Sequence, residues 1–302
     1  MKKVVCIGAL NVDVLLYVDE FCKPDGENAI NNFSVCSGGQ AGNIAAGLGK
    51  LGKKAFFFGN IGDDSHTAML KKDFDDCNVN YSFAKKIDKP NNSVYCLIDK
   101  TGERMLYVQN NTDFSASDFS DELLENTEFI VFSSLIKDDI VKIYVDIARR
   151  AKVKGVKIAM DPGNILAKLG FDKLKPLLEL CDIIFPSLGE AEMLVGNLDN
   201  ISKLTDIIPH VLVTCGKDGI KCYQKNKEMQ HFLAKPFKEN RKIMDSTGAG
   251  DCFAAACIAG LMDDKSVEDS IVFALLASKL SLAKKGARAM PSIEEIEIFR
   301  NE

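Results

Sequence analysis

Short apolar runs alternate with longer amphipathic segments over most of the chain, and this pattern predicts strands alternating with helices. The run at 3–10 reads as a buried strand, 41–52 as a small-residue helix, and 54–62 as the next strand. Apolar strands separated by helices argue for a parallel sheet covered on both faces. Further strands are expected at 128–135, 156–161, 181–187 and 210–216, and helices at 138–155, 173–180, 189–196, 248–262, 266–284 and after Pro291.

Three β-rich pieces do not fit this alternation. The segment 12–18 is one, and 92–109 is a predicted hairpin that turns at Lys100-Thr101-Gly102. We interpret both as a small second sheet inserted between elements of the main one. The third piece, 218–234, is expected to form an antiparallel hairpin. The predicted fold class is therefore α/β: a doubly wound, mostly parallel sheet with helices on both faces, plus a small β-sheet.

Composition and charge exclude several classes of function. The chain has 302 residues with 38 basic and 43 acidic groups, and its basic residues are scattered rather than clustered as nucleic-acid binding requires. The uncharged run 252–262 is too short to span a bilayer. Ten cysteines without a C-x-x-C pair, and only three histidines, make a zinc site improbable. No signal peptide opens the sequence, so we expect a reducing, cytoplasmic setting.

The stretch GLGKLG (47–52) matches a dinucleotide-binding pattern and nearly matches a Walker A loop. A phosphate loop follows a strand and opens a helix, so that helix N–H groups face the anion. Here a helix comes first and a strand follows. We interpret the stretch instead as a closely packed helix that stops at a glycine cap.

Candidate chemistry concentrates in DSTGAGD (245–251), where a helix is expected to begin. The segment 237–244 can deliver an extended chain into this turn. Gly248 and Gly250 let the backbone turn sharply and let a ligand approach closely. The free N–H groups and positive dipole of the helix start then favour an anion, with Asp251 beside it. The alternative is a simple cap with an acidic first turn, but a cap needs neither two glycines nor a second carboxylate.

The stretch DSTGAGDCF (245–253) resembles the D-T-x-G-A-G-D-x-F signature of the ribokinase-like (PfkB) carbohydrate kinases. Other stretches resemble further landmarks of that family, in its order and spacing: GALNVDV (8–14), GGQAGNIAAGLGKLG (38–52), GNIGDD (59–64), VTCGKDG (213–219) and KKGARAMP (284–291). The resemblance implies one doubly wound kinase domain over 1–302. It also implies a β-sheet lid, inserted from about 12–35 and 90–112, which agrees with the inserted strands.

The resemblance also implies roles for residues on the acceptor side. Asp251 takes the place of the catalytic base, and Gly248, Ala249 and Gly250 form the anion hole for the transferring phosphate. The sugar hydroxyls would be held by Asn11, Asp13, Gly38, Gly39 and Asn43. From the residues alone, Asn11 and Asp13 could equally form a turn after the first strand, and Asn43 could cap a helix or face solvent.

On the donor side, the resemblance places ATP with Mg2+. Thr214, Gly216 and Gly219 would line the nucleotide, together with Ser187, Lys284 and Gly286. Glu190 would orient Mg2+ through water, or would simply be a first-turn helix acid. Asp245 and Thr247 fall where many members bind a monovalent cation such as K+. Three features depart from the family pattern: Ser187 replaces an Asn, Gln40 replaces the Lys of ribokinases proper, and DPGNIL (161–166) lacks an Arg.

We therefore expect an ATP-dependent kinase of a small sugar. A nucleoside kinase of the same fold is the alternative, and a non-catalytic sugar or nucleotide sensor is a third hypothesis. The lid segments carry no cluster of Arg or Lys, so an uncharged polyol, sugar or nucleoside is expected as acceptor. Apolar residues expected on exposed lid faces, such as Val12, Leu15, Tyr95 and Leu97, favour a homodimer joined lid to lid. No nucleic-acid or membrane partner is expected.

Overall fold

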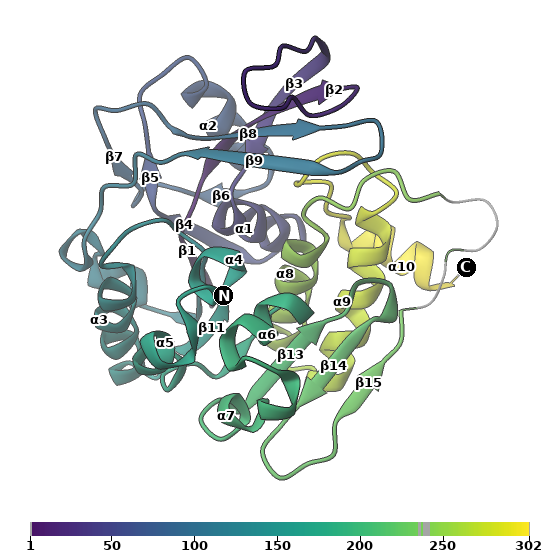
Figure 1. The fold of residues 1–302 in the computed structure, drawn as a ribbon. Coiled ribbons are helices and arrows are strands. Elements are labelled where there is room, and N and C mark those ends of the chain that lie inside the picture. The colour runs from purple at the N-terminus through teal and green to yellow at the C-terminus, as the bar shows by residue number, and fades with distance from the viewer. Residues whose placement is uncertain (1, 235–236, 238–241, 302) are drawn as a thin grey trace.

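A computed structural model describes residues 2–234, 237 and 242–301. Within these residues a nine-stranded sheet forms the centre of the molecule (Figure 1). All neighbours from β6 to β13 pair in parallel, and the last two pairings are antiparallel. In spatial order the strands are β15 (Gln230–Phe232), β14 (Ile220–Tyr223), β13 (His210–Thr214), β12 (Ile183–Ile184), β11 (Lys157–Asp161), β10 (Thr127–Ser133), β1 (Lys3–Ile7), β4 (Lys54–Phe58) and β6 (Val79–Asn80).

Helices cover both faces of this sheet, because successive residues of a strand point to opposite sides. In β1, Val4 and Cys6 belong to one buried cluster, and Val5 and Ile7 belong to the other. The first face packs against α1 (Gln40–Lys50), α2 (Thr67–Asp76), α8 (Ala249–Met262), α9 (Val267–Ser281) and α10 (Ile293–Asn301). The second packs against α3 (Ile140–Val153), α4 (Gly163–Ala167), α5 (Gly170–Leu178), α6 (Leu188–Val195) and α7 (Ser202–Thr205).

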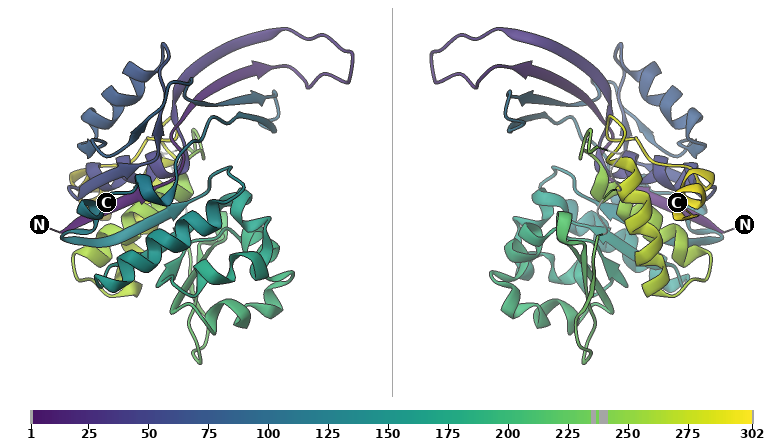
Figure 2. Two further views of the ribbon diagram at one scale, coloured as in Figure 1. Left: turned by 90° about the vertical axis from the view of Figure 1, so that its left-hand side faces the viewer. Right: turned by 90° about the vertical axis from the view of Figure 1, so that its right-hand side faces the viewer.

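A separate four-stranded sheet, called the small sheet below, stands over one edge of this body. Its strands, in spatial order, are β3 (Ile30–Gly38), β2 (Asn11–Val18), β8 (Asn92–Ile98) and β9 (Arg104–Gln109). Figure 2 shows β2 and β3 arching away from the main body as a long ribbon. The remaining short elements are β5 (Asn60–Ile61), β7 (Lys85–Lys86) and the 3-10 turns η1 (Ala116–Asp118), η2 (Asp121–Leu124), η3 (Leu198–Asn200) and η4 (Gly216–Asp218).

The predicted fold class is confirmed, and so are the strands and helices named from the pattern. The pattern did not predict α2, α4 or the full length of β3. Val12, expected on an exposed face, is fully buried, because the first residues of β2 lie where the small sheet meets the main body, and Val12 joins the core there. Among the described residues, no helix combines the length and apolar character needed to cross a bilayer.

The GLGKLG stretch ends α1, as its context predicts. Lys53 N–H donates to the carbonyl of Leu48 at 2.9 Å, and Gly52 N–H donates to that of Gly49 at 3.0 Å. These two bonds form a Schellman cap, with Gly52 in the left-handed region at φ +73°. Gly49 serves packing, since a Cβ there would overlap the carbonyl oxygen of Cys77 at the end of α2.

Gly49→Ala is expected to destabilise the fold, because the new methyl group meets fixed backbone rather than a flexible side chain. The overpacking should lower the free energy of unfolding by about 1–3 kcal/mol. Urea denaturation followed by circular dichroism measures this change. Gly189→Ala in α6 is the matched control, because a Cβ there meets nothing within 4 Å. It should be neutral or stabilising, and an equal loss in both variants would contradict the packing argument.

Candidate active site

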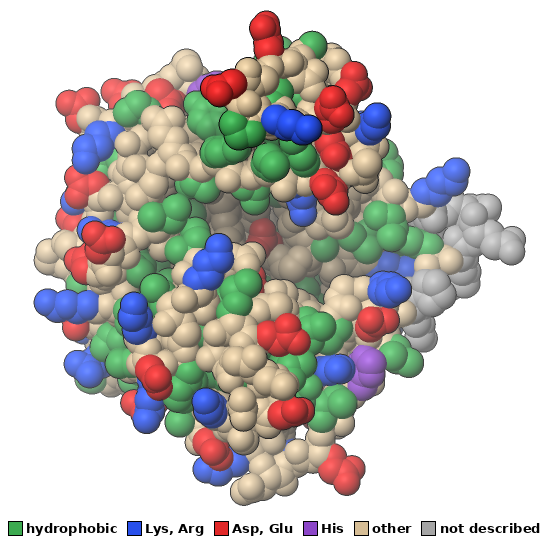
Figure 3. All heavy atoms as spheres, viewed as in Figure 1, with side chains coloured by type: hydrophobic (Ala, Val, Ile, Leu, Met, Phe, Trp, Pro, Cys, Tyr) green, Lys and Arg blue, Asp and Glu red, His purple; other side chains and the backbone are tan. Residues whose placement is uncertain are grey.

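The predicted site residues gather at the carboxyl ends of the central strands. β1 lies between β10 and β4, so the chain leaves the sheet in opposite directions at this point. Open α/β sheets bind ligands in the crevice that such a reversal creates. Figure 3 shows the surface hollowed beneath the small sheet, with an acidic side chain inside the hollow.

The turn before α8 is joined to the loop after α9. The Asp245 carboxylate accepts the N–H of Thr247 at 2.9 Å and the N–H of Gly286 at 3.0 Å. Gly248, the N-cap of α8, lies at φ +76°, and a Cβ there would overlap the carbonyl of Ala287. Glycine is therefore required at this position both by backbone conformation and by close approach. Of the preceding segment 237–244, residues 238–241 lie outside the described residues.

At the start of α8, one backbone N–H group is hydrogen-bonded within the preceding turn, and the space beside Gly250 is free. Ala249 N–H donates to the carbonyl of Ser246 at 3.2 Å. A Cβ at Gly250 would meet no atom within 4 Å, so the helix start is open on that side. Of the three residues predicted to form the anion hole, Gly250 therefore leaves the most room for a ligand beside Asp251.

Asp251 lies in the first turn of α8 and faces α1. Its Oδ2 accepts a hydrogen bond from Nδ2 of Asn43, with 2.8 Å between the two atoms. Burial raises the pKa of Asp251 to about 7, while the bond from Asn43 opposes this shift and the charges of Asp13 and Glu190 add to it. A carboxylate with a pKa near the working pH is suited to accept a proton. Asn43 is buried against this carboxylate rather than facing solvent.

Four further residues predicted on the acceptor side lie together beside Asn43. Asn11 and Gly38 are paired in the β2–β3 ladder. The Asp13 carboxylate lies so close to Gly38 that a Cβ there would overlap it, and a Cβ at Gly39 would overlap a backbone carbonyl of the β1–β2 connection. Burial raises the pKa of Asp13 to about 6, and the charge of Arg288 lowers it.

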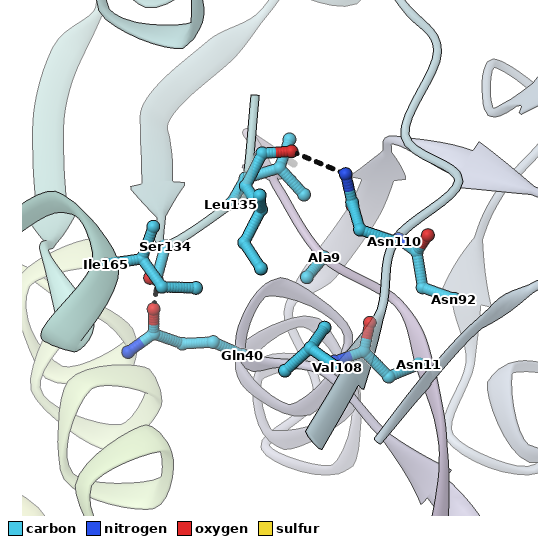
Figure 4. Close-up of a pocket in the computed structure, with 10 residues that line it drawn as sticks. Ala9, Asn11, Gln40, Asn92, Val108, Asn110, Ser134, Leu135 and Ile165 are labelled. Atoms are coloured by element: carbon cyan, nitrogen blue, oxygen red, sulfur yellow. Dashed lines mark hydrogen bonds between the residues drawn. The ribbon is translucent and has the colours of Figure 1, made fainter. Parts of the chain in front are cut away.

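A pocket of about 130 Å³ opens next to Asn11 (Figure 4). Its polar lining is made mainly of carboxamides, and none of the described residues that line it is ionisable. Gln40 accepts the Ser134 N–H at 2.7 Å, and Asn110 donates to the Ile136 carbonyl at 3.0 Å, so the walls are held in place. The carboxamides are Asn11, Gln40, Asn92 and Asn110, and the apolar walls are Ala9, Val108, Leu135, Ile136 and Ile165.

The residues predicted to bind the nucleotide lie around the ends of β12 and β13. Ser187 and Thr214 form a parallel bridge there. Ser187 caps α6 by accepting the Glu190 N–H at 3.3 Å, and the Glu190 carboxylate accepts the Ser187 N–H at 2.8 Å. This reciprocal capping box gives Glu190 the structural role that the sequence left open. Gly216 begins η4, and Gly219, at φ +89°, is pressed against the carbonyl of Phe232.

The loop after α9 brings the last two predicted nucleotide residues into place. Gly286 is fixed by its hydrogen bond to Asp245. The ammonium of Lys284, however, binds the carboxylate of Glu295 in α10 at 2.6 and 2.8 Å. Lys284 is therefore committed to an ion pair in this structure.

Two buried ionisable residues at the site, Asp161 and Arg288, were not predicted from the sequence. Asp161 ends β11, is 5% exposed, and accepts the Gly163 N–H at 3.2 Å. Burial holds its pKa well above the usual range, and the charges of Asp251 and Glu190 raise it further. The sequence feature that could have identified Asp161 is an acidic residue at the end of an otherwise apolar strand. Arg288 lies behind Asn43, and its sequence context, between two alanines, gave no sign of burial.

Asp251→Asn is expected to stabilise the protein increasingly as the pH rises from 4 to 7. In the folded chain the carboxyl stays protonated up to about pH 7, whereas its ordinary pKa is 3.8. The folded state therefore binds more protons in this range, and stability falls with rising pH. The Asn variant has no such titration, so its melting temperature should exceed the wild-type value by more at pH 8 than at pH 5. Glu297→Gln, at an exposed position, is the control; a pH-independent difference for Asp251→Asn would contradict the prediction.

Comparison with known proteins agrees with this geometry. Residues 1–294 match the protein family described as "pfkB family carbohydrate kinase". An ATP-dependent ribose-1-phosphate kinase of Halopiger xanaduensis is 28% identical over 100% of this chain and 99% of its own, and a ribokinase of Haemophilus influenzae is 26% identical over 97% of both. The solved ribokinase of Giardia lamblia shares the fold with a TM-score of 0.88 at 21% identity, covering 99% of this chain and 98% of its own. The chain belongs to the pfkB family carbohydrate kinases and is an ATP-dependent sugar kinase, a phosphotransferase with an alcohol group as acceptor.

Proposed function

We propose that the chain transfers the γ-phosphate of ATP to a hydroxyl of a small neutral sugar, with Asp251 as the base that accepts the hydroxyl proton. The observation that carries this proposal is the Asp251 carboxylate, held at 2.8 Å by Asn43 beside the open start of α8. Phosphoryl transfer depends mainly on alignment and on neutralising charge. A base and a helix N-terminus within one turn supply both requirements.

The nucleotide is proposed to lie along Thr214, Gly216, Gly219 and Ser187, with Gly286 and Lys284 near its base. Its γ-phosphate would then meet Gly248, Ala249 and Gly250, where the α8 dipole and backbone N–H groups favour negative charge. The small sheet is proposed to act as a lid that excludes water from the acceptor. For Lys284 to contact the nucleotide, it would have to exchange its partner Glu295, which is 2.6 Å away.

The residues present fit a divalent cation that arrives with the triphosphate. Among the described residues no three acidic, His or Cys side chains form a ready-made metal site. Glu190 nevertheless lies close enough to Asp161 and Asp251 to raise the pKa of both. A cation that takes most of its ligands from phosphate and water suits this surplus of negative charge, as Mg2+ does. Glu190 would orient it through water, and the bound cation would neutralise charge on the transferring phosphate.

A monovalent cation such as K+ is proposed at Asp245 and Thr247. The Asp245 carboxylate already joins the turn to the loop through two backbone N–H groups, which holds the pKa of Asp245 below its usual value despite the opposing effect of burial. An ionised carboxylate at this junction keeps oxygen ligands available next to the anion-binding turn. Activation by K+ would then act through the geometry of Gly248 and Gly250.

An uncharged acceptor is proposed because the pocket beside Asn11 offers carboxamides and no cationic group. A phosphorylated sugar would call for Arg or Lys. The relatives named ribokinase favour a pentose, whereas the relative named ribose-1-phosphate kinase is the reason to test a sugar phosphate. The apolar walls at Val108, Leu135 and Ile165 also suit a nucleobase, so a nucleoside is the second candidate.

The test is an assay of ADP release from ATP with neutral pentoses, hexoses, nucleosides and sugar phosphates. Neutral acceptors should be preferred, and a preferred sugar phosphate would overturn the proposed acceptor class. Asp251→Asn should lower turnover by at least about two orders of magnitude, the usual scale for a general base. ATP affinity should hardly change, since removing a negative charge beside phosphates does not weaken their binding.

Asp263→Asn, at the other end of α8, is the matched control and should keep wild-type turnover. Near-normal turnover in folded Asp251→Asn would overturn the catalytic assignment. ATP binding without turnover on any acceptor by the wild-type chain would favour the sensor hypothesis.

A homodimer joined through the small sheets is also proposed. Large apolar side chains of the small sheet are exposed, above all Phe33 at 66%, Leu106 at 61% and Tyr107 at 61%. Large apolar side chains exposed on one small sheet commonly mark a protein interface. We further propose a cytoplasmic location, since none of the ten cysteines forms a disulfide.

Light scattering at micromolar concentration should give twice the mass of one chain. Phe33→Glu should shift the mass towards one chain, because it places a charge on the apolar surface. Val153→Glu, in α3 and 89% exposed, is the control and should leave the mass unchanged. A wild-type chain that is monomeric at this concentration would contradict the proposed dimer.

A further inference from the structure

Arg288 is a buried cation behind the acceptor-side residues. Its side chain is 9% exposed, and its guanidinium lies over the ring of Phe74 at 4.9 Å from the ring centre. Its closest carboxylate contact is long, with 3.8 Å between Nη1 and Oδ2 of Asp73. Nη1 finds no hydrogen-bond partner among the residues that the structure describes. A buried donor without a partner carries a free-energy cost.

The other two guanidinium nitrogens reach the acceptor side. Nε–H donates to Oδ1 of Asn43 at 3.4 Å, and Nη2–H donates to the carbonyl of Gly38 at 3.5 Å. A guanidinium can only donate, so Asn43 must present its oxygen to Arg288 and its NH2 group to the other side. On that other side, Nδ2 donates to Asp251 at 2.8 Å.

This chain of contacts fixes which way the Asn43 amide points. Without Arg288 the amide oxygen of Asn43 would lose its donor, and the amide would be freer to leave the orientation in which Nδ2 donates to Asp251. The Gly38 carbonyl, held by the same guanidinium, belongs to the residue that packs against the Asp13 carboxylate. The Arg288 guanidinium therefore hydrogen-bonds two of the predicted acceptor-side residues, Asn43 and Gly38.

We propose that Arg288 is a positioning residue for phosphoryl transfer, which orients Asn43 towards Asp251 and holds Gly38 beneath the acceptor. This inference rests on the proposed function. The guanidinium donates to Asn43 and Gly38, so its effect is transmitted through these two residues. Its loss should therefore affect the acceptor and the chemical step, but not nucleotide binding.

Arg288→Met tests the inference, because Met replaces the unbranched apolar part of the side chain and removes every donor. We expect kcat to fall by about tenfold or more and KM for the acceptor to rise, with ADP affinity measured by calorimetry within about twofold of wild type. Asp73→Asn is the matched control: it removes the surface partner of the same guanidinium and should leave kcat within about twofold. Folded Arg288→Met with wild-type kcat would overturn the inference.

A double-mutant cycle with Asn43→Ala tests the route. If Arg288 acts through Asn43, Arg288→Met should change kcat far less in the Asn43→Ala background than in the wild type. Equal fold-changes in both backgrounds would overturn the proposed route. If Arg288→Met does not fold, Arg288→Lys carries the test. Lys keeps the positive charge but has one nitrogen in place of the two that reach Asn43 and Gly38 in a fixed fork, so kcat should fall with ADP affinity unchanged, and wild-type kcat would overturn the inference.

A wild-type chain without turnover on any acceptor would overturn the proposed function, and this inference with it. An active wild-type chain with an unaffected Arg288→Met variant would overturn this inference alone.

Discussion

Helices α1 and α8 approach each other so closely that small residues line their contact. A Cβ at Gly47 in α1 would come within 2.9 Å of the Ala255 side chain and would overlap Met290, while Gly260 lies against Ser270 of α9. This spacing brings Asn43 and Asp251 within hydrogen-bond distance although 208 residues separate them in the chain. Close packing of the helices therefore determines the geometry at the carboxylate, and the strands and loops complete the site around it.

The site also has an electrostatic constraint. Asp13, Asp161, Glu190 and Asp251 lie near the carboxyl ends of the strands, and burial raises the pKa of three of them. Such a group opposes folding when it is ionised, and it persists because a charged ligand can relieve the repulsion. Arg288 is the buried cation that partly balances this charge on the acceptor side. The site is thus arranged for binding and chemistry at some expense of stability.

Much of the fold could be predicted from the sequence because local signals agreed with the tertiary structure. The 245–251 turn, the hairpin of β8 and β9, and the glycine stop of α1 each have a local cause in glycine or in apolar alternation. The pattern did not predict the polar helix α2, whose buried residues in the structure are only Leu70 and Phe74. Nor did it predict burial of Val12, which depends on how the small sheet meets the core.

For the candidate site, the sequence indicated which residues to expect but not the contacts between them. The motif positions at Asn43 and Asp251 lie together, as the resemblance implied, although no local feature indicates their contact. Ser187 and Glu190 could be assigned either to a cap or to a nucleotide site, and the structure contains the capping box without deciding against the second role. Arg288 was not identifiable, because its importance comes from three partners distant in the sequence: Gly38, Asn43 and Phe74.

The loop between α9 and α10 connects both halves of the site through very few residues. Gly286 is tied to the anion-binding turn by Asp245, and Arg288, two residues later, supports Asn43 and Gly38. An insertion or deletion here would move donor and acceptor supports together, so evolution could not easily alter one specificity through this loop and spare the other. The small sheet is tied to the same supports at Gly38, which ends β3, and at Arg104 of β9, whose Nη1 donates to Oγ1 of Thr247 at 3.4 Å. Substitutions in β2, β3, β8 and β9 away from these contacts would alter the acceptor side and leave the α9–α10 loop unchanged.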